Sequence, residues 1–230
     1  MNQRPGPDTS GGTGRRPRRE ELDPARRAAF DVLRAVSERD AYANLALPAL
    51  LAERRITGRD AAFATELTYG TCRTRGLLDA VIAAAAGRPI DQIDSVLLDL
   101  LRLGTYQLLR TNVAPHAAVS TTVEQAGIEF DSVRAGFVNG VLRTISKRDE
   151  QSWSAELAPA VATDPVGHAA FVHAHPRWIA QAFADALVRS CTSPPGRAYA
   201  PPPNWPKRSA VRLATTRLTR CTWTGAIRAG

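Results

Sequence analysis

The spacing of apolar residues predicts helices through most of the chain. The clearest example runs from Ile93 to Leu108, where apolar residues and Gly104 recur at intervals of three and four positions. Residues with this spacing share one face of a helix, so we expect this helix to be buried at the centre of the fold. No long alternating pattern predicts a strand, and no segment repeats with a fixed period. The predicted fold class is therefore all-α, a helical bundle of about seven to nine helices.

Capping and breaking residues place the ends of the other helices. Asp23 is suited to cap a helix that begins at Pro24, and Thr57 is suited to cap a helix that begins at Gly58. Gly87 follows the last residue of a helix that begins near residue 74. The predicted helices after the first one span residues 44–55, 58–71, 74–86, 93–108, 115–127, 132–147, 165–174 and 176–187.

The same patterns predict which side chains face the core. We expect Leu45 and Val133 to point inward, and Trp178 to anchor the last helix to the domain. Gly104 lies within the buried stripe, where it costs about 1 kcal/mol of helix propensity relative to alanine. That cost is understandable if another backbone crosses the helix closely at this position.

Composition and charge separate two tails from the helical part. Residues 1–22 are rich in Gly, Pro and Arg and have almost no apolar side chains, so we expect a disordered basic arm. Residues 188–230 contain Pro and Arg clusters without apolar periodicity, and we expect a disordered tail there. Of the net charge of +8, residues 1–19 carry +4 and residues 188–230 carry +8, whereas residues 20–187 carry −4. The basic charge therefore lies in the two tails, and any nucleic-acid contact in the helical part would depend on individual arginines.

Several classes of protein are excluded by the pattern. The longest weakly charged apolar stretch, residues 77–86, is interrupted by Asp79 and is too short to span a membrane. The N-terminus lacks the apolar segment that export requires. Three cysteines without short spacing do not indicate a disulfide framework or a zinc ribbon. We expect a cytoplasmic protein with no membrane partner and no metal site.

Five motifs resemble one known family in their order and spacing. They are ELTYGTCRTRGLLD (66–79), LLRLGTYQLL (100–109), PHAAVSTTVEQA (115–126), GFVNGVLRTI (136–145) and HAHPRWIAQAF (173–183). Together they resemble the NusB-like N-terminal domain of the Sun/RsmB family of 16S rRNA (cytosine-5)-methyltransferases, over residues 24–187. Stand-alone NusB antitermination factors share the helical fold but generally lack the HPRWI-type segment. The resemblance implies a NusB-like RNA-binding domain (23–175) and the start of a linker (176–187) to a methyltransferase domain that is missing from this truncated chain.

The resemblance implies chemistry that this chain does not carry. In the family, a Rossmann-like domain binds S-adenosylmethionine, and a Cys thiolate attacks C6 of cytosine so that C5 accepts the methyl group. The family's Pro-Cys nucleophile motif and Gly-rich cofactor loop have no counterpart here, and neither Cys191 nor Cys221 has the expected neighbours. Cys72 is interpreted as a small buried residue. We predict no catalytic residue, no cofactor and no activity for this chain alone.

A frameshift near Leu187 is our hypothesis for the tail. Residues 214–230 can be written as codons whose degenerate third bases are left free. When each third base is read together with the next two bases, this shifted frame permits the sequence DYSPYAVYLDGGDPG. The family carries a similar SPYAVYL segment in its linker domain. Only two of the thirty basic residues are Lys, which suggests GC-rich coding. The alternative is a native tail rich in Pro and Arg.

Arginines are the main candidates for RNA contact because they neutralise phosphates and stack on unpaired bases. The resemblance implies that the N-terminal arginines bind RNA. Two further arginines, at positions 73 and 75, are expected between two helices, and positions 139 and 143 share one helix face because they are four residues apart. The candidate RNA-binding residues are Arg15, Arg16, Arg18, Arg19, Arg26, Arg27, Arg73, Arg75, Asn139 and Arg143.

Each of these residues also has a structural alternative. Arg73 or Arg143 can pair with a helix C-terminus or with an acid such as Asp79, and Asn139 can cap or bridge neighbouring helices. His116, next to Pro115 at a helix start, is interpreted as a packing or hydrogen-bonding residue. The three histidines at positions 168, 173 and 175 lack the neighbouring ligands that a metal site needs.

Two functional classes remain open. In the first, the chain is the RNA-positioning module of a small-subunit rRNA methyltransferase. In the second, it is a NusB-like antitermination or regulatory factor that binds RNA and pairs with a ribosomal protein. The HPRWI segment favours the first class, and the sequence does not determine the oligomeric state.

Overall fold

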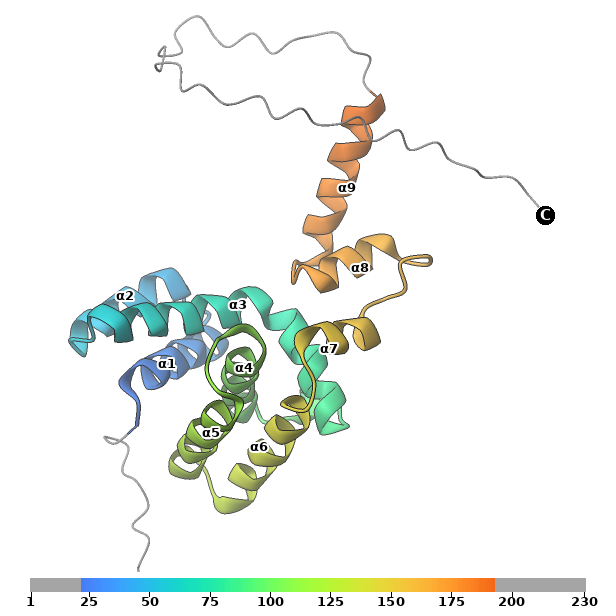
Figure 1. The fold of residues 1–230 in the computed structure, drawn as a ribbon. Helices are drawn as coiled ribbons and strands as arrows, with labels where there is room; N and C mark the ends of the chain where they lie inside the picture. Colours follow the sequence, from blue (N-terminus) through green and yellow to red (C-terminus); the bar gives the residue numbers. More distant parts are fainter. Residues whose placement is uncertain (1–21, 193–230) are drawn as a thin grey trace, which may run out of the picture. The chain divides into compact units, whose positions relative to one another are not determined.

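The computed structural model describes residues 22–192, which form nine α-helices and one 3-10 helix (Figure 1). The α-helices are α1 (Pro24–Arg39), α2 (Ala43–Glu53), α3 (Gly58–Ala86), α4 (Ser95–Arg110), α5 (Pro115–Glu129), α6 (Ser132–Ile145), α7 (Glu150–Leu157), α8 (Pro165–Val172) and α9 (Arg177–Thr192), and the 3-10 helix is η2 (Ile90–Gln92). Within these residues there is no strand, which confirms the all-α class and the expected number of helices. The basic arm and the tail after residue 192 lie outside the described residues.

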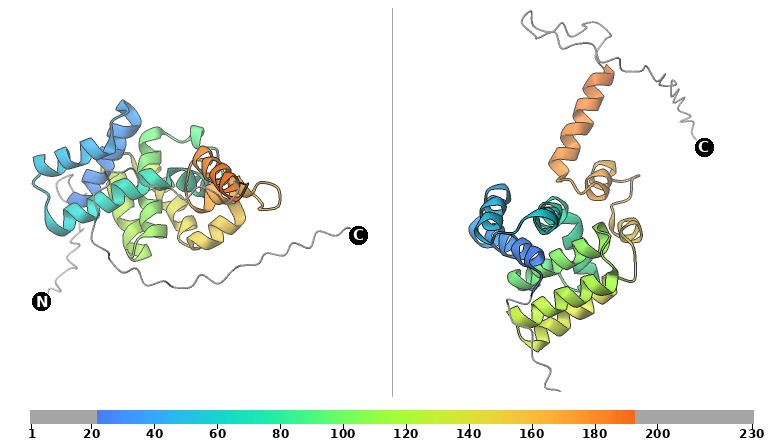
Figure 2. Two further views of the ribbon diagram at one scale, coloured as in Figure 1. Left: turned by 90° about the horizontal axis from the view of Figure 1, so that it is seen from above. Right: turned by 60° about the vertical axis from the view of Figure 1, so that its left-hand side comes forward.

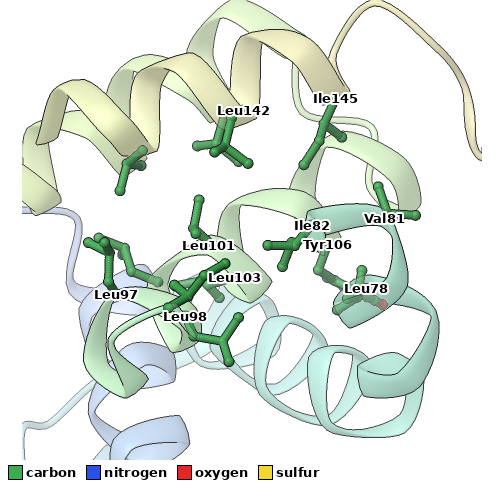
Figure 3. Close-up of a cluster of buried hydrophobic side chains, with 14 of the residues drawn as sticks. Leu78, Val81, Ile82, Leu97, Leu98, Leu101, Leu103, Tyr106, Leu142 and Ile145 are labelled. Carbon is green, nitrogen blue, oxygen red and sulfur yellow. The ribbon is translucent and has the colours of Figure 1, made fainter. Parts of the chain in front are cut away.

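Helix α4 is the buried centre of the fold, as the apolar stripe predicts. It contacts α1, α3, α5 and α6, and every residue from Leu97 to Gln107 is buried. Figure 3 shows its leucines surrounded by Ile82 of α3 and by Leu142 and Ile145 of α6, all three of which are fully buried. Helices α5 and α6 lie side by side against α4 (Figure 2). The most periodic segment of the sequence thus forms the core on which the other helices pack.

Aspartates cap the helices at several chain entries. Asp23 accepts a hydrogen bond from the backbone N–H of Arg26 at 2.8 Å, and Pro24 occupies the first helical position of α1, as predicted. Asp94 and Asp131 cap α4 and α6 in the same way. Helix α3 begins at Gly58 with Thr57 as its N-cap residue, as predicted, but the Thr57 side chain makes no capping hydrogen bond. Gly58 has a φ of +60°, which only glycine adopts readily.

The region from residue 58 to residue 86 forms one helix, whereas the sequence pattern predicts two helices separated near residues 72 and 73. Two threonines of this stretch bond to the preceding turn of the helix, whereas the buried hydroxyl of Thr71, next to the predicted break, has no hydrogen-bond partner among the described residues. The side chains of Thr68 and Thr74 donate to the carbonyls of Ala64 and Gly70, each at 2.8 Å. The face that contains these threonines is buried, so tertiary packing extends the helix through a segment with weak apolar periodicity.

Three further expectations about the core are corrected. Leu45, Val133 and Trp178 are 67%, 80% and 72% exposed, so none of them faces the core. Helical periodicity does not distinguish a residue at the centre of the apolar face from one at the edge of that face. Leu47 of α2 and Val138 of α6 are buried instead. The short helices α7 and η2 are absent from the predicted set because each has few apolar positions. Helix α9 continues to residue 192, past the predicted boundary at residue 187.

Two glycines allow close packing around α4. A Cβ at Gly104 would meet the side chains of Thr122 and Leu142 at 3.0 Å, so side chains of α5 and α6 cross there, rather than the backbone that we expected. A Cβ at Gly70 would lie 2.0 Å from the ring of Tyr106. The glycine of α3 therefore accommodates the aromatic ring of α4, a constraint that the sequence pattern did not reveal.

A buried arginine joins three helices through ion pairs. Arg102 of α4 donates to both carboxylate oxygens of Asp79 on α3, at 2.6 and 2.8 Å, and to Asp99 at 2.9 Å. Asp99, which is 1% exposed, also accepts from Arg34 and Ser37 of α1, at 3.1 and 2.9 Å. Burial lowers the pKa of Arg102, but its bonds to the two carboxylates outweigh that effect and raise the pKa overall.

We expect the substitution Arg102→Met to reduce the free energy of unfolding by about 3–5 kcal/mol, because it removes the main ion-pair partner of the buried Asp99 and of the partly buried Asp79. Urea denaturation of the full chain measures the change. Arg59→Met, at an exposed position of α3, is the control and should change stability by less than about 0.5 kcal/mol. Equal effects of the two substitutions would contradict the structural role of the network.

The phenol of Tyr106 gives a second stability prediction. Burial, followed by its hydrogen bond to the Glu66 carboxylate, raises the pKa of Tyr106 to about 12. In the unfolded chain the pKa is about 10, so this contribution to stability is complete below pH 10 and is lost as the pH rises from about 10 to about 12. The absorbance of ionised tyrosine is measured as the pH rises, for the native chain and for Tyr106→Phe. The difference between the two curves gives the pKa of Tyr106. Glu66→Gln should lower its pKa but leave it above 10, and an unchanged pKa would contradict the assigned interaction.

Candidate nucleic-acid interface

A groove with a volume of about 980 Å³ lies between α5 and α6. Its apolar wall includes Val119 and Val123 of α5 and Ala135 of α6. Small residues, Gly127, Ala135 and Gly136, line part of the groove. A Cβ at Gly127 or Gly136 would meet no atom within 4 Å, so the groove is open at these two positions. The groove between α5 and α6 therefore combines an accessible apolar wall with polar groups around it.

Asn139 and Arg143 lie on this groove, one helical turn apart on α6, as their spacing predicts. Arg143 is exposed, and its guanidinium has no hydrogen-bond or ion-pair partner among the described residues. His116, at the start of α5, lines the same groove, and Glu124 is its acidic member. The groove thus offers an amide, an imidazole and an unneutralised guanidinium beside apolar side chains.

Arg73 and Arg75 lie within α3, so their expected position between two helices is wrong. Both are exposed and line a second groove of about 520 Å³ between α3 and the segment from residue 159 to residue 177. The same groove is lined by His175 and Arg177, which belong to the HPRWI-type segment. From the sequence, His175 is expected to bind no metal, and Arg177 is not among the candidate residues. His175 and Arg177 come close to α3 only because of the path of the folded chain, so no pattern of neighbouring residues in the sequence indicates this proximity.

The arginines at the start of α1 are engaged within the fold. Arg26 donates to the side chain of Gln107 at 2.7 Å, pairs with Asp23 at 2.9 Å and lies over the ring of Phe63, 5.0 Å from its centroid. Its side chain is only 14% exposed. Arg27 faces Asp31 at 3.8 Å. The four arginines at positions 15, 16, 18 and 19 lie outside the described residues, and RNA contact by all six stays a prediction.

Other reactive groups have structural surroundings. Burial raises the pKa of the Cys72 thiol, although Arg75 opposes this effect, so the thiol form is favoured over the nucleophilic thiolate. A ring nitrogen of His168 lies 2.9 Å from the Pro159 carbonyl. No cluster of three metal-ligating side chains occurs among residues 22–192. Within the same range, every helix is too short or too polar to cross a membrane.

The comparisons with known proteins agree with this fold. The sequence profile of the NusB family matches residues 23–147. A candidate methyltransferase of Mycobacterium tuberculosis is 82% identical over 173 residues, which cover 75% of this chain and 38% of that protein. A probable small-subunit rRNA methyltransferase B of Bacillus subtilis is 31% identical over 69% of this chain and 34% of its own length. The corresponding Escherichia coli enzyme is 30% identical over 85% of this chain and 42% of its own length.

Solved structures show the same helical fold. The antitermination factors NusB and NusE in complex with double-stranded RNA include a chain that is 27% identical, with a TM-score of 0.50 over 54% of this chain and 95% of the other. NusB of T. maritima is 23% identical, with a TM-score of 0.52 over 59% of this chain and 96% of the other. This chain spans about two fifths of the length of the curated methyltransferase relatives it matches. On the match over residues 23–147 and the shared helical fold, the chain belongs to the NusB family.

Proposed function

We propose that this chain supplies the RNA-binding helical domain of an S-adenosylmethionine-dependent 16S rRNA (cytosine-5)-methyltransferase. The observation that carries the proposal is the extent of the matches. The family profile ends at residue 147, whereas the matches to the methyltransferases cover 173 residues in the M. tuberculosis protein and 196 in the E. coli enzyme. Similarity to the methyltransferases thus continues through residues that the NusB profile does not match.

The α5–α6 groove has the chemistry that single-stranded RNA requires. Unpaired bases bind to apolar and planar surfaces and form hydrogen bonds with amide groups, while their phosphates attract guanidinium groups. Val119 and Val123 provide the apolar surface, Asn139 provides the amide and Arg143 provides the charge. We assign RNA binding to this groove, together with the basic arm of residues 1–22 that precedes α1.

The described residues do not fit the methyl donor. S-adenosylmethionine binds at the carboxyl ends of parallel strands, beside a Gly-rich turn, in a Rossmann-like domain. Residues 22–192 contain no strand, and neither of their two cysteines, Cys72 and Cys191, is preceded by a proline. We therefore place methyl transfer in the part of the relatives that this chain does not match, and we assign to this chain the positioning of cytoplasmic small-subunit rRNA.

The RNA partner can be identified by titration of the full chain. We expect small-subunit rRNA fragments to bind more tightly than an antitermination RNA, at each of two salt concentrations, with an affinity that falls as salt rises. Selective binding of the antitermination RNA would overturn this proposal and favour an antitermination factor, as NusB and NusE are described in the neighbouring structure.

The groove itself is tested by Arg143→Ala. Removal of its guanidinium should weaken rRNA binding about tenfold and reduce the salt dependence, because one phosphate contact is lost. Arg134→Ala is the matched control, since Arg134 lies on the same helix with a 51% exposed side chain near Asp131, outside the groove. Equal effects of the two substitutions, measured by fluorescence anisotropy, would exclude a specific role for the groove.

A further inference from the structure

The second groove differs from the α5–α6 groove in the chemistry of its rim. Three of the side chains that line it are arginines, Arg73, Arg75 and Arg177, and the imidazole of His175 lines it as well. None of the described residues that line it is an Asp or a Glu. A concave surface with this composition attracts anions, even though residues 20–187 carry a net negative charge.

The inner surface of this groove is apolar. Leu77 of α3 is buried, and Ala170 and Phe171 of α8 line the opposite side. Phe171 is partly buried and packs against the main hydrophobic core, so the rest of the fold supports its ring. The volume of about 520 Å³ is in the range of pockets that bind small organic ligands. Apolar and aromatic surface beneath a cationic rim suits a flat base that carries a phosphate.

The two arginines of α3 retain hydrogen-bonding capacity for a ligand. Arg73 uses only its Nε, which donates to the Tyr69 carbonyl at 3.1 Å. Arg75 lies 3.8 Å from Asp79, whose two carboxylate oxygens already accept hydrogen bonds from Arg102. The Arg75 side chain is 56% exposed. A phosphate at the rim would therefore meet guanidinium groups that the fold has not fully used.

Arg177 is held at the rim by an ion pair. It donates to Asp164, and this bond is the main reason that the pKa of the carboxyl is lowered. Asp164 also caps α8 by accepting from the backbone N–H of Gly167 at 2.8 Å. A Cβ at Gly167 would lie 2.0 Å from the Asp164 carboxylate and 2.7 Å from the Arg177 guanidinium. The small residue thus allows the pair to cross the start of α8.

Gly76 leaves the α3 side of the groove open. It lines the groove between the arginines and Leu77, and a Cβ built on it would meet no atom within 4 Å. Glycine within a helix costs about 1 kcal/mol relative to alanine, and here no close neighbour requires it. An open wall at this position leaves space for a ligand.

We propose that the groove between α3 and the α8–α9 junction binds one unpaired nucleotide of RNA, with its base against Phe171 and its phosphate at Arg73, Arg75 and Arg177. This inference rests on the proposed RNA-binding function and adds a second contact point, on different helices from the α5–α6 groove. It explains why an HPRWI-type segment follows the NusB-like helices: the segment completes a nucleotide pocket on α3.

The test uses the full chain and a fluorescent single-stranded RNA dodecamer of mixed sequence, with a blunt duplex of the same sequence for comparison. Gly76→Leu fills the open wall without removing a charge, and we expect it to weaken single-strand binding about tenfold while duplex binding changes little. Gly140→Leu is the matched control, because Gly140 lies in α6 outside both grooves and a Cβ there also meets no atom within 4 Å. Thermal unfolding verifies that both variants fold.

A charge variant provides an independent measurement. The double substitution Arg73→Ala and Arg75→Ala should weaken single-strand binding about tenfold and reduce its salt dependence. Arg59→Ala, about 24 Å away along the same helix, should leave binding unchanged. Native affinity in both Gly76→Leu and the double variant would overturn the pocket and leave RNA binding by the domain intact.

Two further outcomes separate the alternatives. If the native chain binds neither RNA, the proposed function itself fails. If uridine monophosphate displaces the dodecamer at equal concentration, the groove is a site for free nucleotides, and the assignment to RNA is overturned.

Discussion

The fold depends on how the buried guanidinium of Arg102 is neutralised. Asp79 and Asp99 surround it, and Arg34 extends the network to α1. A buried charge is tolerated only with such partners, so the positions of α1, α3 and α4 relative to one another are tightly constrained. In the same network both carboxylate oxygens of Asp79 accept hydrogen bonds from Arg102, so the nearby Arg75 makes only a 3.8 Å ion pair with Asp79. One internal electrostatic requirement thus sets both the packing of the core and the charge of the second groove.

The sequence could predict the parts of the fold that local rules determine. The stripe of α4 and the Asp23 cap follow from spacing and hydrogen-bonding preference, and both are confirmed. The continuity of α3 could not be predicted, because it depends on burial of its threonine-containing face in the fold, where α3 packs against α4. The exposure of Trp178 could not be predicted either. The spacing of apolar residues around an aromatic residue is the same whether or not another helix covers its side chain.

The candidate site divides along the same line. Asn139 and Arg143 could be placed together because four residues separate them on one helix. The second groove joins positions about a hundred residues apart in the sequence, so only the folded chain brings Arg177 close to Arg73. Arg26 is a residue for which the sequence predicts an RNA contact that the fold does not favour. Its sequence position favours an RNA contact, but its side chain is used by Gln107, Asp23 and Phe63 within the fold.

The length of α3 has a mechanical consequence. Its 29 residues extend about 43 Å, and the helix contributes Ala64 to the cluster formed with α1 and α2 and Leu78 to the main core around α4. Phe63 packs against both clusters. A single rigid rod therefore crosses the boundary between them, and neither cluster can rotate about a hinge without bending that rod. Force applied to one end of α3 is transmitted to the other, so the two clusters should behave as one elastic body.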